Sequence, residues 1–212
     1  MLKKPFFIVF EGVEGCGKSY QSKKLFNSIK KQNIPSILTR EPGGTRSAEI
    51  IRSLILKDYF TLDKKEKFHK LTDTLLYLAA RNEHIQDKLL PAIKQKKIII
   101  CDRFIDSTYA YQVYGKKVNR IFIDHIHKFI LSGIKPNLTF ILNVSASKAA
   151  FRLKKRKSIN RYDKFSKKFY NDAKNAFIKI AKDKKNYYVL DSSNNDNRLE
   201  KNIFDIVFKH LK

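Results

Sequence analysis

Eight consecutive residues near the N-terminus have the types and spacing of a phosphate-binding loop. They match the pattern Gly, four residues, Gly-Lys-Ser, and are Gly12, Val13, Glu14, Gly15, Cys16, Gly17, Lys18 and Ser19. In such a loop successive backbone N–H groups point at one anion, and the start of the following helix adds its positive dipole end. The alternative is a glycine-rich turn with a surface lysine. An apolar run before the motif and a helical pattern after it favour a nucleotide phosphate site.

Lys18 is predicted to reach the β- and γ-phosphates of the nucleotide, and the Ser19 hydroxyl is predicted to bind Mg²⁺. A second motif fits this chemistry, because the apolar run Ile98–Cys101 is followed by Asp102 and Arg103. An acidic residue at the end of a buried strand can hold Mg²⁺ or its waters. The arginine suggests that a second phosphate is bound. Asp102 could instead cap a helix and pair with Arg103, an alternative that the motif alone leaves open.

The composition is that of one globular domain spanning residues 1–212, with 42% hydrophobic residues. The formal net charge of +25 would suit a nucleic-acid-binding protein. Lysine is spread over the whole chain, however, so we predict no specific nucleic-acid partner. No apolar stretch approaches the length of a membrane helix, and we expect a cytoplasmic protein without membrane contact. Cys16 and Cys101 are expected to be reduced thiols.

Strand-like and helical patterns alternate along the chain, which predicts a doubly wound parallel sheet of about five strands flanked by helices. The predicted strands are 6–10, 36–39, 98–101, 138–144 and 187–190. The predicted helices are 18–31, 46–56, 67–94, 105–114, 119–131, 148–155, 166–182 and 198–211. Pro91 is expected to kink or end its helix. Ligands of such a sheet bind at the carboxyl ends of the strands.

Four motifs in order resemble the bacterial thymidylate kinases, and the resemblance runs from about Phe6 to Leu211. Besides the phosphate-binding loop, they are Arg40-Glu41-Pro42-Gly43-Gly44-Thr45, Leu75-Leu76-Tyr77-Leu78-Ala79-Ala80-Arg81, and the segment from Asp102 to Gln112. The resemblance implies a P-loop kinase fold with a lid, Mg²⁺ as cofactor and a homodimer. It also implies ATP-dependent phosphorylation of dTMP to dTDP, in the synthesis of dTTP.

The resemblance also implies a role for each matching residue. Residues implied to bind dTMP are Glu14, Arg40, Arg52, Tyr77, Arg81, Arg103, Thr108 and Gln112. Glu14 matches the contact to the deoxyribose 3′-OH, and Arg40 and Arg103 match the contacts to the acceptor phosphate. Tyr77 stands where the family stacks an aromatic ring on thymine, and Arg81 where it donates to thymine O4. Without the motif order, Tyr77 would be read as a core aromatic residue and Arg52 as a solvated charge.

A basic run follows the fourth predicted strand, from Arg152 to Asp163. Such a run is more often a solvated helix face. The family resemblance instead implies a lid at about residues 152–165. Family members whose phosphate loop contains Glu-Gly take their catalytic arginine from the lid, and Glu14-Gly15 follows that pattern. Arg156 and Arg161 are therefore the two candidates beside Lys18 and Arg103 as catalytic residues, and the sequence does not choose between them.

Three other classes of nucleotide-binding protein are less consistent with the chain. A nucleic-acid-dependent ATPase should carry a water-activating acid after Asp102, where this chain has Arg103. A GTP-binding switch should contain Asn-Lys-x-Asp, and the sequence has no such tetrapeptide. A nucleotide or deoxynucleoside kinase with another base preference is the nearest rival.

Overall fold

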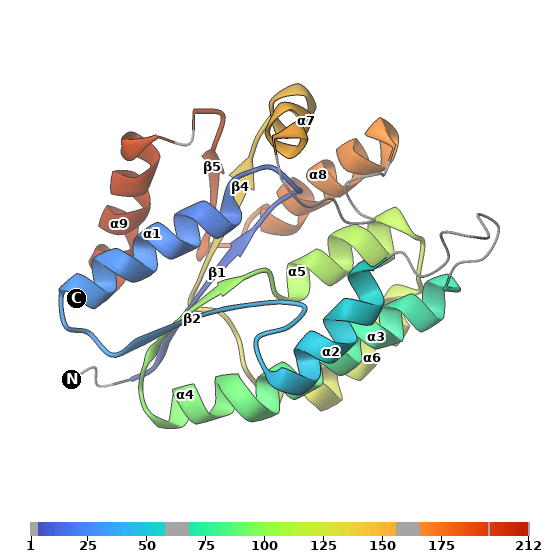
Figure 1. Ribbon diagram of the computed structural model, residues 1–212, viewed down its shortest axis with the longest axis horizontal. Coiled ribbons are helices and arrows are strands. Elements are labelled where there is room, and N and C mark those ends of the chain that lie inside the picture. The colour runs from blue at the N-terminus through green and yellow to red at the C-terminus, as the bar shows by residue number, and fades with distance from the viewer. Residues whose placement is uncertain (1–3, 58–67, 156–165, 195, 212) are drawn as a thin grey trace.

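The protein is built around one parallel sheet, seen in a computed structural model that describes residues 4–57, 68–155, 166–194 and 196–211 (Figure 1). Five strands form it in the order β2-β3-β1-β4-β5. Their bounds are Phe6–Glu11 (β1), Ser36–Arg40 (β2), Ile98–Asp102 (β3), Leu138–Asn143 (β4) and Tyr187–Asp191 (β5). The three central strands are almost wholly buried, whereas the edge strands β2 and β5 are partly exposed. The predicted parallel α/β sheet is confirmed.

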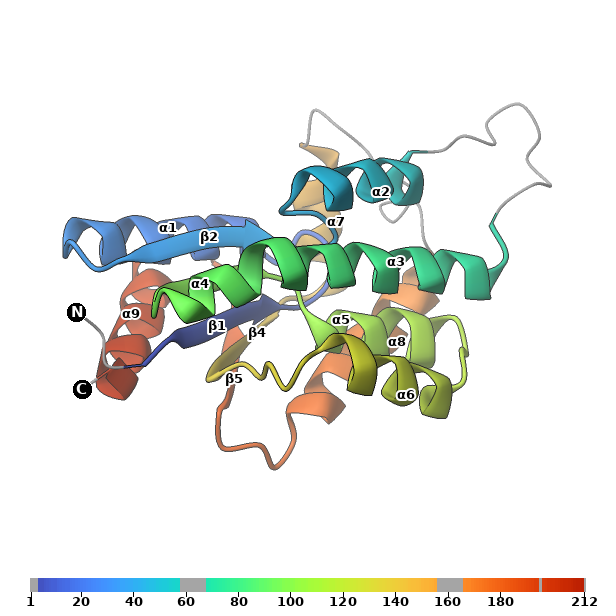
Figure 2. The same ribbon diagram turned by 90° about the horizontal axis from the view of Figure 1, so that it is seen from below.

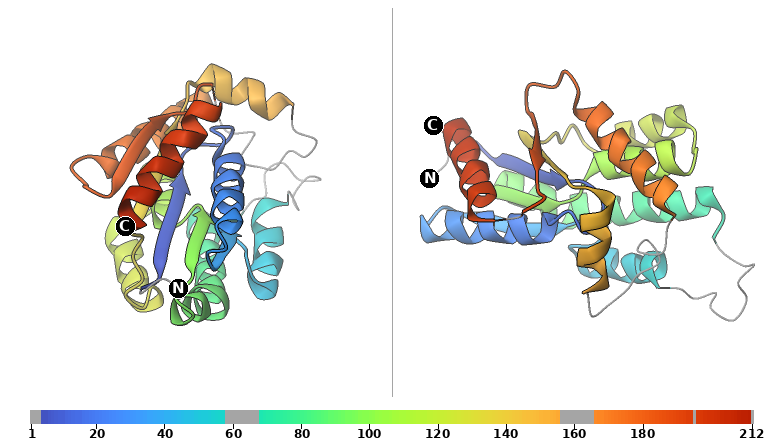
Figure 3. Two further views of the ribbon diagram at one scale, coloured as in Figure 1. Left: turned by 90° about the vertical axis from the view of Figure 1, so that its left-hand side faces the viewer. Right: turned by 90° about the horizontal axis from the view of Figure 1, so that it is seen from above.

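Side chains of successive strand residues enter two different parts of the core, because they point to opposite faces of the sheet. Phe10 on β1 pairs in register with Phe140 on β4, and both pack in the part of the core that α1 and α9 cover. Phe7 and Val9 belong to a second cluster, with side chains of the helical segment from residue 85 to residue 92. Helices thus cover both faces of the sheet, as the two views of Figure 3 show.

The helices agree closely with the sequence prediction, and two of them match it residue for residue. Within the described residues the α-helices are Lys18–Lys31 (α1), Arg46–Leu56 (α2), Lys70–His84 (α3), Leu90–Lys94 (α4), Ile105–Thr108 (α5), Arg120–Ile130 (α6), Ala146–Lys154 (α7), Lys167–Ala181 (α8) and Asn197–Leu211 (α9). The hydroxyl of Thr45 accepts a hydrogen bond from the N–H of Ala48 and so caps the start of α2. No described helix is both long enough and apolar enough to span a membrane.

Two stretches predicted as α-helix contain π-helical turns instead. The first, η1 (Ile85–Leu89), joins α3 to α4, and the second, η2 (Tyr109–Gly115), continues α5. The sequence predicted that Pro91 would kink or end its helix; helical structure continues through Pro91 to Lys94, so it does not end there. Proline has no N–H to donate to the preceding turn, and the π-helical turn lies directly before it. The second π-helical segment carries Tyr111 and Gln112 toward the site described next.

The strand register brings the predicted functional groups to one end of the sheet. Phe10 and Arg40 both lie in register with Asp102, one on each side of β3. The phosphate-binding loop follows β1, the Glu41 segment follows β2, and Arg103 follows β3. Because all strands are parallel, these chain segments leave the sheet at the same edge. Helix α3, which carries Tyr77 and Arg81, lies between α2 and α6 (Figure 2).

Candidate active site

Two glycines of the loop after β1 allow its backbone to approach neighbouring chain closely. Gly12 has a φ of 133°, and a Cβ there would lie 2.5 Å from the carbonyl oxygen of Leu142. Gly15 has a φ of 75°, and its Cβ would lie 2.6 Å from the carbonyl oxygen of Ala149. Any larger residue would be strained at either position. The side chains of Val13 and Cys16 are buried in the core, so these two residues present only backbone to a ligand.

Lys18 and Ser19 begin α1, directly after Gly17, which has no side chain to cover the helix N-terminus. The Lys18 Nζ donates to the carbonyl oxygen of Val13 at 2.9 Å and therefore lies across its own loop. The Ser19 hydroxyl donates to Asp102 Oδ2, which joins the start of α1 to the end of β3. A hydroxyl and a carboxylate held together are oxygen ligands of the kind that Mg²⁺ accepts, and Mg²⁺ takes its remaining ligands from phosphates and water. The residues present therefore fit this ion.

A single pocket brings the predicted acceptor-binding residues together with the loop. All eight of these residues line it: Glu14, Arg40, Arg52, Tyr77, Arg81, Arg103, Thr108 and Gln112. Lys18, Ser19 and Asp102 line the same pocket. The sequence motifs are separated by up to about half of the chain, so their meeting in one cavity depends on the sheet topology.

Arg103 lines the pocket and is held by three partners. It adopts a left-handed backbone conformation with a φ of 74°. Its Nη2 lies 2.7 Å from Glu14 Oε1, and its Nη1 donates to the carbonyl oxygen of Gly12 and to Ser107 Oγ, both at 3.0 Å. The hydroxyl of Tyr111 donates to the other Glu14 oxygen at 2.6 Å. The loop and the segment after β3 are thereby joined by a partly buried ion pair.

The second predicted phosphate-binding arginine is more exposed. Arg40 Nη2 lies 3.0 Å from both carboxylate oxygens of Glu49, and the Arg40 side chain is 53% exposed. Arg52 donates from Nη1 to the carbonyl oxygen of Pro42, at 2.5 Å. Glu49 and Arg52 both come from α2, so this helix fixes the segment after β2 at the mouth of the pocket.

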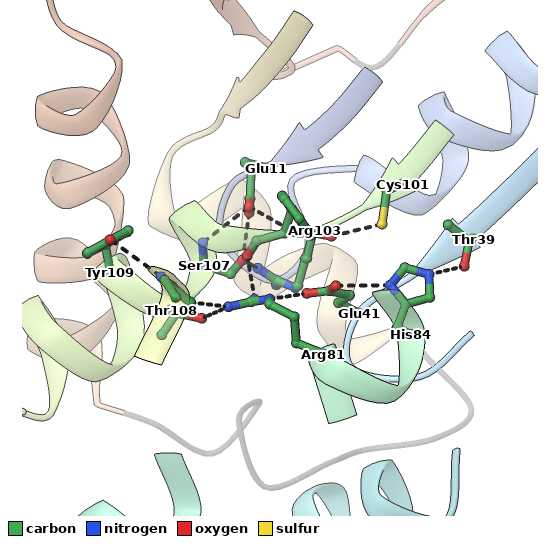
Figure 4. A network of polar contacts seen from close by, with 12 residues as sticks. Glu11, Thr39, Glu41, Arg81, His84, Cys101, Arg103, Ser107, Thr108 and Tyr109 are labelled. Carbon is green, nitrogen blue, oxygen red and sulfur yellow. Dashed lines mark hydrogen bonds and ion pairs between the residues drawn. The ribbon is translucent and has the colours of Figure 1, made fainter. Parts of the chain in front are cut away.

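Arg81 is buried, and its guanidinium has protein partners on three sides (Figure 4). Its Nε donates to Glu41 at 2.7 Å, its Nη2 to the carbonyl oxygen of Phe104 at 2.9 Å, and its Nη1 to Thr108 Oγ1 at 2.8 Å. The second oxygen of Glu41 lies 2.9 Å from Nδ1 of His84. Burial alone would raise the pKa of Glu41, but the charge of Arg81 and the hydrogen bond to His84 outweigh it and hold that pKa below its usual value.

A second buried carboxylate lies beneath Arg103. Glu11 accepts hydrogen bonds from the backbone N–H of Phe104 at 2.8 Å and from the backbone and hydroxyl of Ser107, at 3.2 and 2.6 Å. Burial, and then the charge of nearby Asp106, raise the pKa of Glu11 to about 8. Burial raises the pKa of Asp106 as well. Because Ser107 Oγ also accepts from Arg103, Glu11 anchors the segment that carries this arginine (Figure 4).

Sequence reasoning missed the residues that hold the pocket from behind. From the sequence, no role was assigned to Glu11, Glu41, Tyr111 or any of the five histidines. His84 and His127 are both buried, and both belong to the network around Arg81. The sequence does show a carboxylate, Glu11 or Glu41, shortly after each of two predicted strands. That position does not reveal which residues bind these carboxylates in the folded protein.

The lid prediction falls mostly outside the described residues, and so do Arg156 and Arg161. At the start of the predicted lid, Arg152 lies in α7. It donates to the carbonyl oxygen of Gly15 at 3.2 Å and to those of Ser192 and Ser193 at 2.9 and 2.8 Å.

The expectation of free thiols is confirmed, since Cys16 and Cys101 are both unbridged and buried.

The sequence model of the thymidylate kinase family matches residues 10–203. The chain belongs to the thymidylate kinase family. The match includes the phosphate-binding loop and every predicted site residue, so the resemblance inferred from four motifs holds over most of the chain.

Individual thymidylate kinases are similar over nearly the full length. That of Mycoplasmoides gallisepticum is 37% identical over 193 residues, which cover 91% of this chain and 89% of the relative. That of Wolbachia pipientis subsp. Culex pipiens is 38% identical over 214 residues, with 97% of each chain covered. The crystal structure of thymidylate kinase from Ehrlichia chaffeensis superposes with a TM-score of 0.74 at 31% identity, over 96% of this chain and 99% of that one. The thymidylate kinase fold is therefore shared.

Proposed function

We propose that this protein transfers the γ-phosphoryl group of ATP to dTMP and releases ADP and dTDP. The observation that carries the proposal is the pocket in which a phosphate-binding loop faces two arginines and a buried guanidinium. Such a pocket has a place for a donor phosphate, an acceptor phosphate and a polar base edge. Membership of the thymidylate kinase family supports the same reaction.

On the donor side, the backbone of residues 12–19 binds the ATP phosphates and Lys18 contacts the β- and γ-phosphates. Ser19 and Asp102 would hold Mg²⁺, which would supply positive charge against the phosphates of ATP. The protein's own part is to fix the phosphates against the loop and to supply positive charge where the transferring group passes.

On the acceptor side, Arg40 and Arg103 bind the dTMP phosphate by charge-assisted hydrogen bonds. Two anionic reactants repel each other, so these arginines are needed to bring the acceptor oxygen into line with the γ-phosphorus. That oxygen forms the new P–O bond as the bond to the ADP oxygen breaks. Glu14 binds the deoxyribose 3′-OH. Because Glu14 belongs to the donor loop and pairs with Arg103, it links the two substrate sites.

The base is held by α3 and by the segment after β3. Tyr77 stacks on the thymine ring, and Arg81 donates to thymine O4. Cytosine carries an amino donor at the corresponding position, so Arg81 would face a donor and dCMP is rejected. Thr108 and Gln112 contact the rest of the base edge, and Arg52 supports the pocket. Their common position in the cavity lining supports this arrangement.

A lid arginine completes the proposal for catalysis. Arg156 or Arg161 stabilises charge on the transferring phosphoryl group, as an arginine finger within the same chain does. No general base is assigned, since phosphoryl transfer depends mainly on positioning and on electrostatic stabilisation.

A coupled assay of ADP release with dTMP, dUMP, dCMP, AMP and thymidine as acceptors tests the proposed function. We expect the highest kcat/KM with dTMP, and at least about 100-fold less turnover of dCMP, because its amino group would leave Arg81 without an acceptor. If dTMP were turned over no faster than the other acceptors, the proposal would be wrong.

We also propose that two copies of the chain associate through α2, α3 and α6. Large apolar side chains on these adjacent helices are exposed, among them Ile50 at 61% and Phe129 at 70%. The others are Leu54, Leu71, Leu75 and Ile121. Association would remove this apolar surface from water and offset the repulsion between two strongly basic chains.

Light scattering after gel filtration should therefore give twice the chain mass of 24.9 kDa. Ile50→Glu and Leu75→Glu should each shift the protein to the monomer, because a carboxylate would be buried in the interface. Phe151→Glu is the matched control, since Phe151 on α7 is also exposed but lies on another helix. A monomeric wild type, or an equal effect of the control, argues against this interface.

Residues 1–212 act as one domain, which is supported by the single sheet and by the extent of the family match. The enzyme works in the cytoplasm on small nucleotides, without a membrane. It has no specific nucleic-acid partner, which is supported by the spread of lysine along the sequence.

A further inference from the structure

The contact that the proposed function leaves unexplained is the one between Arg81 and His127. His127 lies on α6 and is buried, with 3% of its surface exposed. Its Nε2 is 2.7 Å from Nη1 of Arg81. The same Nη1 donates to Thr108 Oγ1, so both of its hydrogens are used. His127 does not line the pocket itself, but it contacts Arg81, which does. Helix α6 thus acts on the pocket through His127.

The hydrogen-bond directions fix the protonation of the imidazole. An arginine N–H only donates, so His127 Nε2 must be the acceptor and carry no proton. In the neutral ring the proton is then on Nδ1, which lies 3.4 Å from the hydroxyl oxygen of Tyr109. Tyr109 donates its own proton to Asp124 at 2.6 Å, so its oxygen is able to accept. Four residues thus form one consistently directed chain from Arg81 to the surface carboxylate of Asp124.

We propose that His127 is a positioning residue for substrate recognition, which holds the Arg81 guanidinium in one plane for the acceptor base. Glu41 fixes the Nε side, Thr108 and His127 fix Nη1, and Phe104 takes one hydrogen of Nη2. Among the described residues this leaves one of the five N–H groups, on Nη2, for a ligand. The inference rests on the proposed function, in which that ligand is an oxygen of the base.

A neutral acceptor suits this position better than a carboxylate. Glu41 already balances the charge of Arg81, and a second anion on the guanidinium would compete with the substrate oxygen for its positive charge. Burial, and then the positive charge of Arg81, lower the pKa of His127 to about 3. The imidazole is therefore uncharged at pH 7 and able to accept. It fixes the arginine without neutralising it.

Two substitutions of His127 distinguish the effect of losing its hydrogen-bond acceptor from the effect of losing the packed volume of its ring. His127→Leu removes the acceptor, and His127→Gln places an amide oxygen at a reach similar to that of Nε2. We expect His127→Leu to raise the KM for dTMP about 10-fold, as for a lost hydrogen bond to a charged group. The preference for dTMP over dCMP should fall by a similar factor. The KM for ATP and kcat should stay within about threefold, and His127→Gln should restore most of the loss.

Combining the exchange with Arg81→Met tests whether His127 acts through Arg81. If it does, adding His127→Leu to Arg81→Met changes the KM for dTMP by less than about twofold, because the partner is already gone. His125→Leu is the matched control, since His125 is exposed on the same helix. If His127→Leu fails to fold in a thermal melt, His127→Met supplies the variant without the ring acceptor.

Three results would overturn the inference. The first is that the effects of His127→Leu and Arg81→Met on the KM for dTMP multiply in the double variant. The second is that His127→Leu raises the KM for ATP as much as that for dTMP. The third is that His127→Leu and His127→Gln do not differ. Failure of the proposed function is recognised separately, because it is measured on the wild type with the nucleotide panel. If another nucleotide proves to be the best acceptor, the same variants are measured with that nucleotide.

Discussion

Replacing Arg103 with methionine should lower kcat/KM for dTMP by about 10²- to 10³-fold, while the KM for ATP changes little. The estimate is that for removing one preorganised charged donor from a reaction centre. Arg103 is fixed by its protein partners Glu14, Gly12 and Ser107. In the proposed role its charge would therefore meet the acceptor phosphate without the cost of ordering a flexible side chain. Methionine keeps much of the apolar stem and removes every donor.

Two further substitutions, Arg103→Lys and Arg120→Met, serve as comparisons for Arg103→Met. Arg103→Lys keeps the positive charge and loses the planar fork, so it should recover only part of the activity. Arg120→Met is the matched control, because Arg120 on α6 is 64% exposed and makes an i,i+4 ion pair with Asp124. Steady-state kinetics with both substrates varied measures the effects. A full rate in Arg103→Met, or a loss in Arg120→Met of the same size, would contradict the assigned role.

The sequence was sufficient to predict the elements that carry a local signal. Helix α2 was predicted from Arg46 to Leu56, the bounds it has, from its helical pattern alone, and the structure adds the cap by Thr45. The apolar runs predicted the buried central strands, since strands covered on both faces carry little polar alternation. The π-helical segments η1 and η2 were not predicted. A π-helical turn has no local residue signature of its own, and the sequence patterns there are compatible with an α-helix.

In the site too, residues with a local sequence signal were predicted and residues without one were not. The loop from Gly12 to Ser19 was found from its residue pattern, and the pair Asp102-Arg103 from its place at the end of an apolar run. Both could be placed together because parallel strands end at one edge of the sheet. The network behind Arg81 was not found, because its members meet only after folding. Glu41 and Arg81 are 40 positions apart, and Arg81 and His127 are 46 apart. No spacing rule joins residues from three separate segments, so a buried histidine and a surface histidine look alike in the sequence.

The second large effect is expected on stability. Glu41→Ala should lower the free energy of unfolding by about 3–5 kcal/mol, because it leaves the charge of Arg81 buried without an anion. Glu41 and Arg81 are almost inaccessible to solvent, with 4% and 3% of their side chains exposed, so water cannot replace the lost carboxylate. His84 loses one of its two hydrogen-bond partners as well and keeps only Thr39. Urea denaturation followed by circular dichroism measures the loss.

Glu49→Ala is the matched control, because Glu49 pairs with Arg40 at the surface, and such pairs contribute at most about 1 kcal/mol. The pH dependence provides a second test. The pKa of Glu41 in the folded protein lies below its ordinary value of 4.5. Its stabilisation is therefore present above pH 4.5 and lost as the pH falls through the folded-state pKa. The difference between wild type and Glu41→Ala should accordingly shrink in acid. A loss no larger than that of Glu49→Ala would show that the buried carboxylate does not hold Arg81 in place.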